Sequence, residues 1–139
     1  LVCLLRGHSS SIKVAAAFPS NDRVATGGYD NRAVIWNAST GEILHDLRHW
    51  DWVTSIAILG SGERIASVLG YRYAVLWSTI SGERLHTMVD SGSDRLHGIV
   101  AFPHDDRIAG FTETQVFIWN SSGHLLQQLV DDTQQIEGL

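Results

Sequence analysis

The sequence has 139 residues, of which 44% are hydrophobic and 18% are charged, as in an ordinary folded domain. Its 10 Lys and Arg side chains face 15 Asp and Glu, giving a formal net charge of −5. This balance argues against nucleic-acid binding, which needs clustered basic side chains for the phosphates. No apolar run is long enough to span a bilayer, so we expect no membrane insertion. The single cysteine, Cys3, cannot form an internal disulfide and indicates a reducing, intracellular compartment, cytoplasmic or nuclear.

Short apolar runs, each bounded by Gly, Asn, Ser, Asp or Pro, follow one another along the chain. Their length and their content of Val, Ile and Ala predict strands, and no segment holds a helical period. Most runs are apolar at nearly every position, which predicts strands buried on both faces, as in stacked sheets. In chain order the runs occupy residues 12–18, 23–28, 33–37 and 42–47, then 53–59, 64–69, 74–78 and 83–88, then 96–102, 107–111, 116–120 and 124–129.

The runs repeat with a period of about 41 residues. Trp36, Trp77 and Trp119 recur at spacings of 41 and 42, each near the end of the third run of its unit. A Gly follows each Trp by four or five residues, at Gly41, Gly82 and Gly123. Each unit is therefore predicted to be a four-stranded sheet joined by tight turns. Radial repetition of such sheets is the architecture of an all-β propeller.

The first unit contains Gly7-His8, Thr26, Asp30 and Trp36 in this order, and with them it resembles the WD repeat. In that family the His, hydroxyl, carboxylate and indole form a hydrogen-bonded chain, the structural tetrad, that ties the inner loop to the third strand. The resemblance assigns these roles to His8, Thr26, Asp30 and Trp36. Such buried polar groups must satisfy one another, because each unpaired one costs about 1–3 kcal/mol.

The other two units match the WD pattern only in part. The second unit keeps His49, Ser67 and Trp77, but Tyr71 stands at the position of the Asp. In the third unit only Trp119 matches clearly, with Gly92 in place of the His, Ala109 or Gly110 in place of the hydroxyl and Glu113 in place of the Asp. We therefore expect a complete polar chain in the first blade alone.

The resemblance covers essentially the whole chain, so residues 1–139 are predicted to form one propeller segment. Three blades cannot close a ring, so we expect a fragment of a longer propeller, whose missing blades come from the rest of the native chain or from another copy. The outer flanks of the first and third blades should then expose apolar sheet faces. The predicted parts are residues 1–6 (the last strand of a preceding blade, at 2–5), 7–47 (blade 1), 48–90 (blade 2), 91–130 (blade 3) and 131–139 (the start of a further repeat).

The candidate chemistry of the chain is structural. His8, Thr26 and Asp30 contain the groups of a catalytic triad, but in the WD fold they are buried, bond one another and lack oxyanion donors. None of the seven histidines pairs with another at a zinc-site spacing. We therefore expect no catalytic, cofactor or metal site, and no enzymatic activity.

The functional signal lies in loops that WD propellers gather on their narrower face: the loop entering the first strand and the turn between the second and third strands. Aromatic and Arg side chains in loops are typical of protein interfaces, so we expect a scaffold that binds a protein or peptide there. Alternatively, Trp50 or Trp52 packs inward over the altered polar chain, and the blades only complete a ring or a larger assembly; an enzyme is a remote alternative. The partner-binding candidates are Trp50, Trp52, Arg72, Tyr73, Tyr29 and Arg32.

Overall fold

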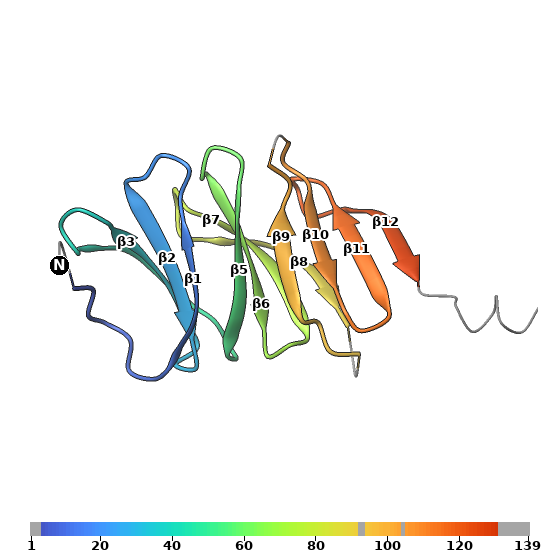
Figure 1. Cartoon of the computed structure of the whole chain (residues 1–139), viewed down its shortest axis with the longest axis horizontal. Helices are drawn as coiled ribbons and strands as arrows, with labels where there is room; N and C mark the ends of the chain where they lie inside the picture. The colour runs from blue at the N-terminus through green and yellow to red at the C-terminus, as the bar shows by residue number, and fades with distance from the viewer. Residues whose placement is uncertain (1–3, 92–93, 104, 131–139) are drawn as a thin grey trace, which may run out of the picture.

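The computed structural model describes residues 4–91, 94–103 and 105–130, which form three antiparallel four-stranded sheets. The sheets stand side by side in chain order, like neighbouring blades (Figure 1). Within each blade, every strand pairs with the next along the chain. Blade 1 holds β1 (Ile12–Ala17), β2 (Arg23–Gly28), β3 (Arg32–Asn37) and β4 (Ile43–Arg48); blade 2 holds β5 (Val53–Leu59), β6 (Arg64–Leu69), β7 (Tyr73–Ser78) and β8 (Arg84–Asp90); blade 3 holds β9 (Gly98–Ala101), β10 (Ile108–Phe111), β11 (Gln115–Trp119) and β12 (Leu125–Val130).

These strands confirm the predicted all-β fold with three four-stranded blades. The ends of the chain differ from expectation. Leu4 and Leu5, the described part of the strand expected at residues 2–5, form no strand. A strand there would need a sheet edge to pair with, and no fourth sheet stands beside blade 1 in the described chain. Residues 2–3, and the start of a further repeat expected at 131–139, lie outside the described residues.

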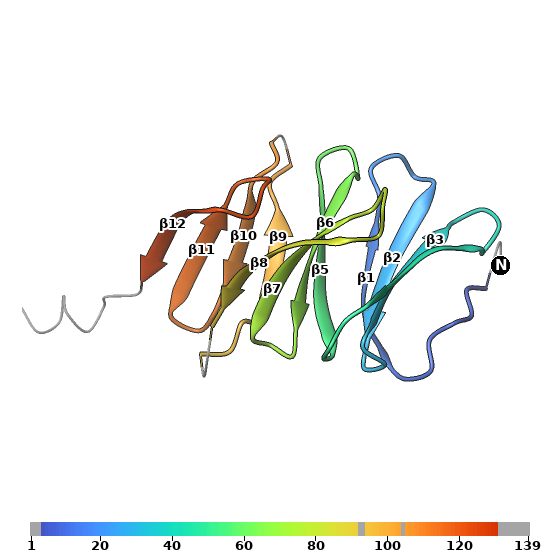
Figure 2. The same cartoon turned by 180° about the vertical axis from the view of Figure 1, so that it is seen from behind.

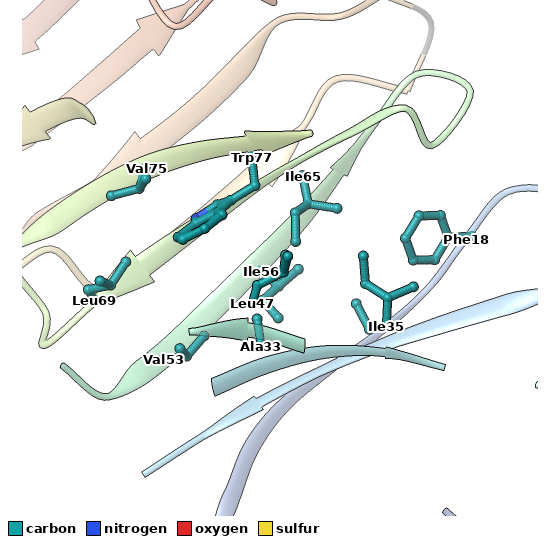
Figure 3. Packing of buried hydrophobic residues seen from close by; sticks show 11 residues of the cluster. Phe18, Ala33, Ile35, Leu47, Val53, Ile56, Ile65, Leu69, Val75 and Trp77 are labelled. Carbon is teal, nitrogen blue, oxygen red and sulfur yellow. The ribbon is translucent and has the colours of Figure 1, made fainter. Parts of the chain in front are cut away.

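The core lies between the blades. Blade 1 packs Phe18, Ile35 and Leu47 against Ile56 and Trp77 of blade 2 (Figure 3). A second cluster fills the gap between blades 2 and 3. The middle strands β6 and β7 contribute to both clusters because alternate residues point to opposite faces. Their continuous apolar sequence is therefore explained by burial on both faces, as predicted.

The three repeated tryptophans hold equivalent places in this packing. Trp36, Trp77 and Trp119 are exposed by 1%, 6% and 0%. Each pairs with the first or second residue of the neighbouring second strand, in the pairs Trp36–Val24, Trp77–Ile65 and Trp119–Ile108. Trp77 faces blade 1 and Trp119 faces blade 2. The indole thus fills the gap between its own sheet and the sheet that precedes it.

The outer strands depart from the expectation of burial on both faces. Every residue of β12 is exposed, and most of β4 and β8 is exposed too. These strands are the last of each sheet, so each pairs with one strand only; β8 and β12 can be seen in Figure 2. Leu47 of β4 is the exception, because it packs against blade 2. These strands contain Leu and Val although they are mostly exposed. The prediction of burial on both faces was therefore wrong for them.

The two flanks of the array also differ from each other. Blade 3 exposes Val100, Phe111 and Val116, as expected for a sheet face without a neighbour. On blade 1, by contrast, Val34 and Trp36 are buried. The segment before β1 covers this flank, because a Cβ added at Gly7 would lie 2.9 Å from the Trp36 ring. The expected exposed face of blade 1 is therefore covered at its centre.

We expect Trp77→Ala to lower the free energy of unfolding by about 3–5 kcal/mol, because it empties a packed space between two blades. Urea unfolding followed by circular dichroism measures this change. Trp50→Ala is the matched control, since the same side chain is 46% exposed there. Equal losses in the two variants would contradict the assignment of Trp77 to the core.

Candidate functional site

A continuous chain of hydrogen bonds joins four side chains of blade 1. The Trp36 indole N–H donates to Thr26 Oγ1 at 2.8 Å, and the Thr26 hydroxyl lies 2.6 Å from His8 Nε2. His8 Nδ1 lies 2.8 Å from Asp30 Oδ2, which also accepts the Ser9 N–H. With Nδ1 donating to the carboxylate, Nε2 accepts the Thr26 proton, so one neutral tautomer serves the whole chain. Both His8 and Asp30 have side chains that are at most 3% exposed.

Blade 2 holds a shortened form of this chain. The Trp77 indole N–H donates to Ser67 Oγ at 3.1 Å, and that hydroxyl lies 2.9 Å from His49 Nε2. His49 Nδ1 donates to the backbone carbonyl of Leu47 at 2.8 Å instead of to a carboxylate. Burial lowers the pKa of His49 to about 4, against a smaller raising effect of the Leu47 carbonyl. His49 is therefore neutral near pH 7.

Blade 3 has lost the polar partners of its tryptophan. The strand register places Gly110 at the position of Thr26 and Ser67. The Trp119 indole N–H is buried without a hydrogen-bond partner among the described residues. A Cβ added at Gly110 would lie 2.8 Å from the Trp119 ring, so the ring occupies the space that a Ser or Thr side chain would need. Glu113 is exposed in a turn, and Gly92 lies outside the described residues.

The loops expected on the narrow face do lie along one edge of the array. Antiparallel pairing brings the start of each first strand, the end of each second strand and the end of each fourth strand to the same edge. This is the lower edge in Figure 1, and we call it the narrow face. It comprises residues 7–11, 29–31, 49–52, 70–72, 94–97 and 112–114.

One group on the narrow face surrounds Trp50, whose side chain is 46% exposed. Its ring lies edge-on to Tyr73, with 5.6 Å between ring centroids. Arg84 lies over the Trp50 ring at 5.1 Å, and Arg72 lies over Tyr73 at 5.0 Å. The Arg72 guanidinium also donates two hydrogen bonds to Asp90, at 2.5 and 3.0 Å. Of the candidates, Tyr73 thus contacts both Trp50 and Arg72.

A second group joins blades 1 and 2. Trp52 is 44% exposed and stacks on Tyr29 of blade 1, with 4.2 Å between ring centroids. Tyr71 sits in the tight turn between β6 and β7, at a φ of +59° after Gly70 at +57°, closed by a 2.9 Å bond from Arg72 N–H to Leu69 O. Two successive positive φ angles are typical of hairpin turns that match the strand twist. The alternative in which Trp50 or Trp52 packs inward predicts a buried ring, whereas both residues are exposed.

Arg32 lies apart from the other partner-binding candidates. Its side chain is 12% exposed and pairs with Asp46 at 2.9 Å. A further bond joins it to the Gly7 carbonyl, and Asp30 lies 3.7 Å away. These partners hold the pKa of Arg32 above its usual value, through Asp46 first. Arg32 therefore fastens the covering segment of residues 4–10 to blade 1 and offers little surface to a partner.

Sequence reasoning missed three cations that lie over aromatic rings. Lys13 Nζ lies 4.7 Å from the Tyr29 ring within blade 1, and Arg84, at the start of β8, lies over Trp50 within blade 2. Arg95 lies 3.7 Å from the Tyr71 ring and joins blades 2 and 3. Tyr71, at the position of the missing Asp, is half-buried in this group, and His49 bonds the Leu47 carbonyl instead. Each contact joins residues that are not neighbours in the sequence, so no short motif could reveal it.

Metal, membrane and cavity features complete the description of the same residues. The described part of the chain contains no group of three or more His, Cys, Asp or Glu side chains placed to hold a metal ion. Across residues 4–91, 94–103 and 105–130, no helix has the length and apolar character to cross a membrane. A polar cavity of about 220 Å³ lies at the opposite edge, between blades 2 and 3, lined by Glu63, Arg64, Asp106 and neighbouring Ser side chains.

Asp30→Ala should lower the free energy of unfolding by about 1–3 kcal/mol, because it leaves the buried donors of His8 and Ser9 without an acceptor. Glu113→Ala is the matched control, since that carboxylate is exposed in the corresponding turn region of blade 3. Urea titrations of both variants measure the difference. Equal effects would show that the Asp30 carboxylate contributes nothing specific.

The pKa of His49 predicts a loss of stability in mild acid. Because burial lowers the folded-state pKa from 6.5 to about 4, protonation favours the unfolded chain. The stabilisation from neutral His49 is complete above the unfolded-state pKa of 6.5. It declines as the pH falls from 6.5 towards the folded-state pKa of about 4. Between pH 7.5 and pH 5 the loss should reach about 2 kcal/mol.

His49→Gln should be less sensitive to pH by that amount, measured as the difference in unfolding free energy between the two chains at each pH. Taking the difference cancels the carboxylates that both chains share. An identical pH dependence of the two chains would show that His49 is not held neutral by burial.

Comparison with known proteins agrees with this arrangement. The family model "WD domain, G-beta repeat" matches residues 1–37. Apoptotic protease-activating factor 1 of Homo sapiens is 32% identical over 76 residues, covering 48% of this chain and 6% of that protein. Ribosome assembly protein 4 of Saccharomyces cerevisiae is 37% identical over 65 residues, covering 45% of this chain and 13% of that protein.

Among solved structures, the RRP9 WD40 repeats superimpose with a TM-score of 0.83 at 22% identity, over 91% of this chain and 40% of that one. This chain therefore spans less than half the length of each protein that it matches here. The family match lies at residues 1–37, and the repeated tryptophans, the four-stranded blades and the structural match show the fold of a WD-repeat propeller segment.

Proposed function

We propose that the chain is a non-catalytic scaffold that binds a protein or peptide on the narrow face of blade 2, with Trp52 as the anchor. The observation that carries this proposal is the exposure of two tryptophans, 46% for Trp50 and 44% for Trp52, on one edge of an otherwise packed blade. Exposing a large ring costs free energy that burial against a partner would recover. Tryptophan is also enriched among residues that dominate interface energetics.

Preorganisation supports the same proposal. Trp52 is held by Tyr29, and Trp50 by Tyr73 and Arg84. A partner would meet rings that are already fixed, so binding would cost little side-chain entropy. The sister repeats hold Ser11 and Arg95 where blade 2 holds Trp52. Blade geometry therefore does not require an aromatic ring at this position.

A structural role for the tetrad side chains supports the non-catalytic part of the proposal. Both ring nitrogens of His8 are engaged, one by Thr26 and one by Asp30, and the His8 and Asp30 side chains are almost fully buried. A substrate could not reach them without breaking the chain of bonds. The names of two relatives, a protease-activating factor and a ribosome assembly protein, support an intracellular role for the scaffold. The net charge of −5 supports a function without nucleic-acid contact.

A second candidate function is ring completion by another copy or by other blades. The face of blade 3 that carries Val100, Phe111, Val116 and Leu129 favours it, because these side chains are between 37% and 57% exposed. Burying such a face is worth about 25 cal/mol per Å² of apolar area. Sedimentation equilibrium separates the two, since ring completion alone predicts a compact oligomer with its tryptophan-bearing narrow face unused.

Trp52→Ala should weaken partner binding by about 2 kcal/mol or more, which is roughly thirtyfold. Its unfolding free energy should fall by no more than about 1.5 kcal/mol, because the ring loses one stacking contact and no buried core space. Proteins captured on the immobilised wild-type chain are identified by mass spectrometry, then titrated against both chains by calorimetry.

Ile80→Ala is the control for this experiment, because Ile80 is an apolar residue, 71% exposed, in the β7–β8 turn at the opposite edge. It should leave binding unchanged. If Trp52→Ala destabilises the chain by several kcal/mol while binding persists, Trp52 packs the blades and does not anchor a partner.

A further inference from the structure

Two cations of the narrow face lie over tyrosine rings from neighbouring blades. Lys13, on β1 of blade 1, has its Nζ 4.7 Å from the Tyr29 ring centroid. Arg95, in the segment leading into β9 of blade 3, has its guanidinium carbon 3.7 Å from the Tyr71 ring centroid. Both cations are exposed, whereas both tyrosines are half-buried. Cations at this range are attracted by the ring faces, which fixes their position.

The two tyrosines couple these pairs into one cluster. The two phenol groups act on each other: Tyr71 raises the pKa of Tyr29, and Tyr29 lowers the pKa of Tyr71. Arg95, over the Tyr71 ring, adds to the lowering of the Tyr71 pKa, and Lys13 lowers it further through its charge. We name Lys13, Tyr29, Tyr71 and Arg95 the phenol–cation cluster. Trp52 borders it through its stack on Tyr29.

The cluster carries positive charge without carboxylate partners in the described chain. Arg32 and Arg72, also on this face, are paired with Asp46 and Asp90. No ion pair within 4.0 Å joins Lys13 or Arg95 to a described carboxylate. The chain as a whole is negative, at −5. The cluster therefore holds two cations that have no ion-pair partner among the described residues, in a chain that is negative overall.

Three acidic residues around the cluster are engaged elsewhere. Asp30, next to Tyr29 in the sequence, accepts hydrogen bonds from His8 and Ser9. Asp51 accepts the backbone N–H of Trp52 at 2.7 Å and contacts Gly70. Asp94 lies 3.4 Å from both Thr114 Oγ1 and Gln115 Nε2 of blade 3. None of these carboxylates bonds Lys13 or Arg95. An anion arriving from solvent would therefore not have to displace an internal ion pair.

The phenol–cation cluster favours an anionic ligand over a cationic one. A cationic ligand would compete for ring faces that Lys13 and Arg95 already cover, and it would be repelled by them. An anionic oxygen would meet two cations and phenol hydroxyls that donate hydrogen bonds, which are the stronger kind when one member is charged. The Trp52 ring beside the cluster offers contact to an apolar neighbour of that anion.

We propose that the phenol–cation cluster of Lys13, Tyr29, Tyr71 and Arg95 accepts a carboxylate from an acidic segment of the protein partner. This inference rests on the proposed function and adds to it the chemistry of the partner. The anchor Trp52 supplies apolar contact, and the cluster beside it sets the preference for Asp or Glu in the bound segment.

The test uses a fluorescein-labelled peptide of alternating Glu and Gly, with its Gln–Gly counterpart as the neutral probe. Fluorescence anisotropy should show that the wild-type chain binds the Glu peptide in preference to the Gln peptide. Arg95→Gln and Lys13→Gln should each weaken Glu-peptide binding by roughly tenfold. Tyr71→Phe, which keeps the ring and removes the hydroxyl, should weaken it by a smaller factor.

Arg107→Gln is the matched control: it removes the same charge from a guanidinium 4.1 Å from the Phe102 ring, near the β9–β10 turn at the opposite edge. It should leave Glu-peptide binding unchanged, and urea midpoints should show that all variants remain folded. Equal binding of the Glu and Gln peptides, or equal losses with Arg107→Gln and Arg95→Gln, would overturn the inference. Binding of a phosphoserine peptide without any of the Glu peptide would also overturn it, in favour of a phosphorylated partner.

The outcome for the proposed function is read separately. If a captured partner depends on Trp52 but is indifferent to Arg95→Gln and Lys13→Gln, the scaffold function stands and the acidic preference fails. If the partner is indifferent to Trp52→Ala as well, both fail.

Discussion

The structure depends on a tryptophan placed in the third strand of each blade. Trp77 and Trp119 fill the space between their own sheet and the preceding one, and Trp36 fills the same position under the segment that covers blade 1. A four-stranded sheet is too small to bury its own apolar faces, so it is stable only when neighbours cover them. One large ring per gap meets this requirement, and its spacing of about 41 residues sets the period of the fold.

The polar chain attached to each tryptophan is more variable than the tryptophan itself. It is complete in blade 1, ends on the Leu47 carbonyl in blade 2 and is lost in blade 3. In blade 3 the Trp119 ring stands against Gly110, which leaves no room for a hydroxyl. The indole N–H there has no hydrogen-bond partner among the described residues, and the ring stacks on Phe117 with 5.6 Å between ring centroids. Apolar packing around the tryptophan is thus common to all three blades, whereas the complete polar chain occurs only in blade 1 among the described residues.

Strands and blades could be predicted from the sequence because both are local: short apolar runs end at turn residues, and the repeat fixes their order. The exposure of the outer strands could not be predicted from the sequence. Apolar residues such as Leu125 and Leu126 of β12 do not indicate whether another sheet covers them. The candidate site was predicted in part. Trp50 and Trp52 stood out by contrast with the sister repeats, whereas Lys13 and Arg95 stand out only from their contacts with Tyr29 and with Tyr71 of the neighbouring blade, respectively.

The departure of blade 2 from the WD pattern and the character of its narrow face have one physical origin. His49 needs an acceptor for its Nδ1 proton, and the Leu47 carbonyl provides it within the same segment of chain. The position of the missing Asp is thereby released from the buried polar chain, so Tyr71 can occupy it and reach Tyr29 of blade 1 and Arg95 before blade 3. The shortened polar chain of blade 2 is therefore what allows Tyr71 to join a row of aromatic rings and cations that extends from blade 1 to blade 3. Packing around the tryptophans keeps the blades in register while this surface varies, which is the separation of tasks that a binding scaffold requires.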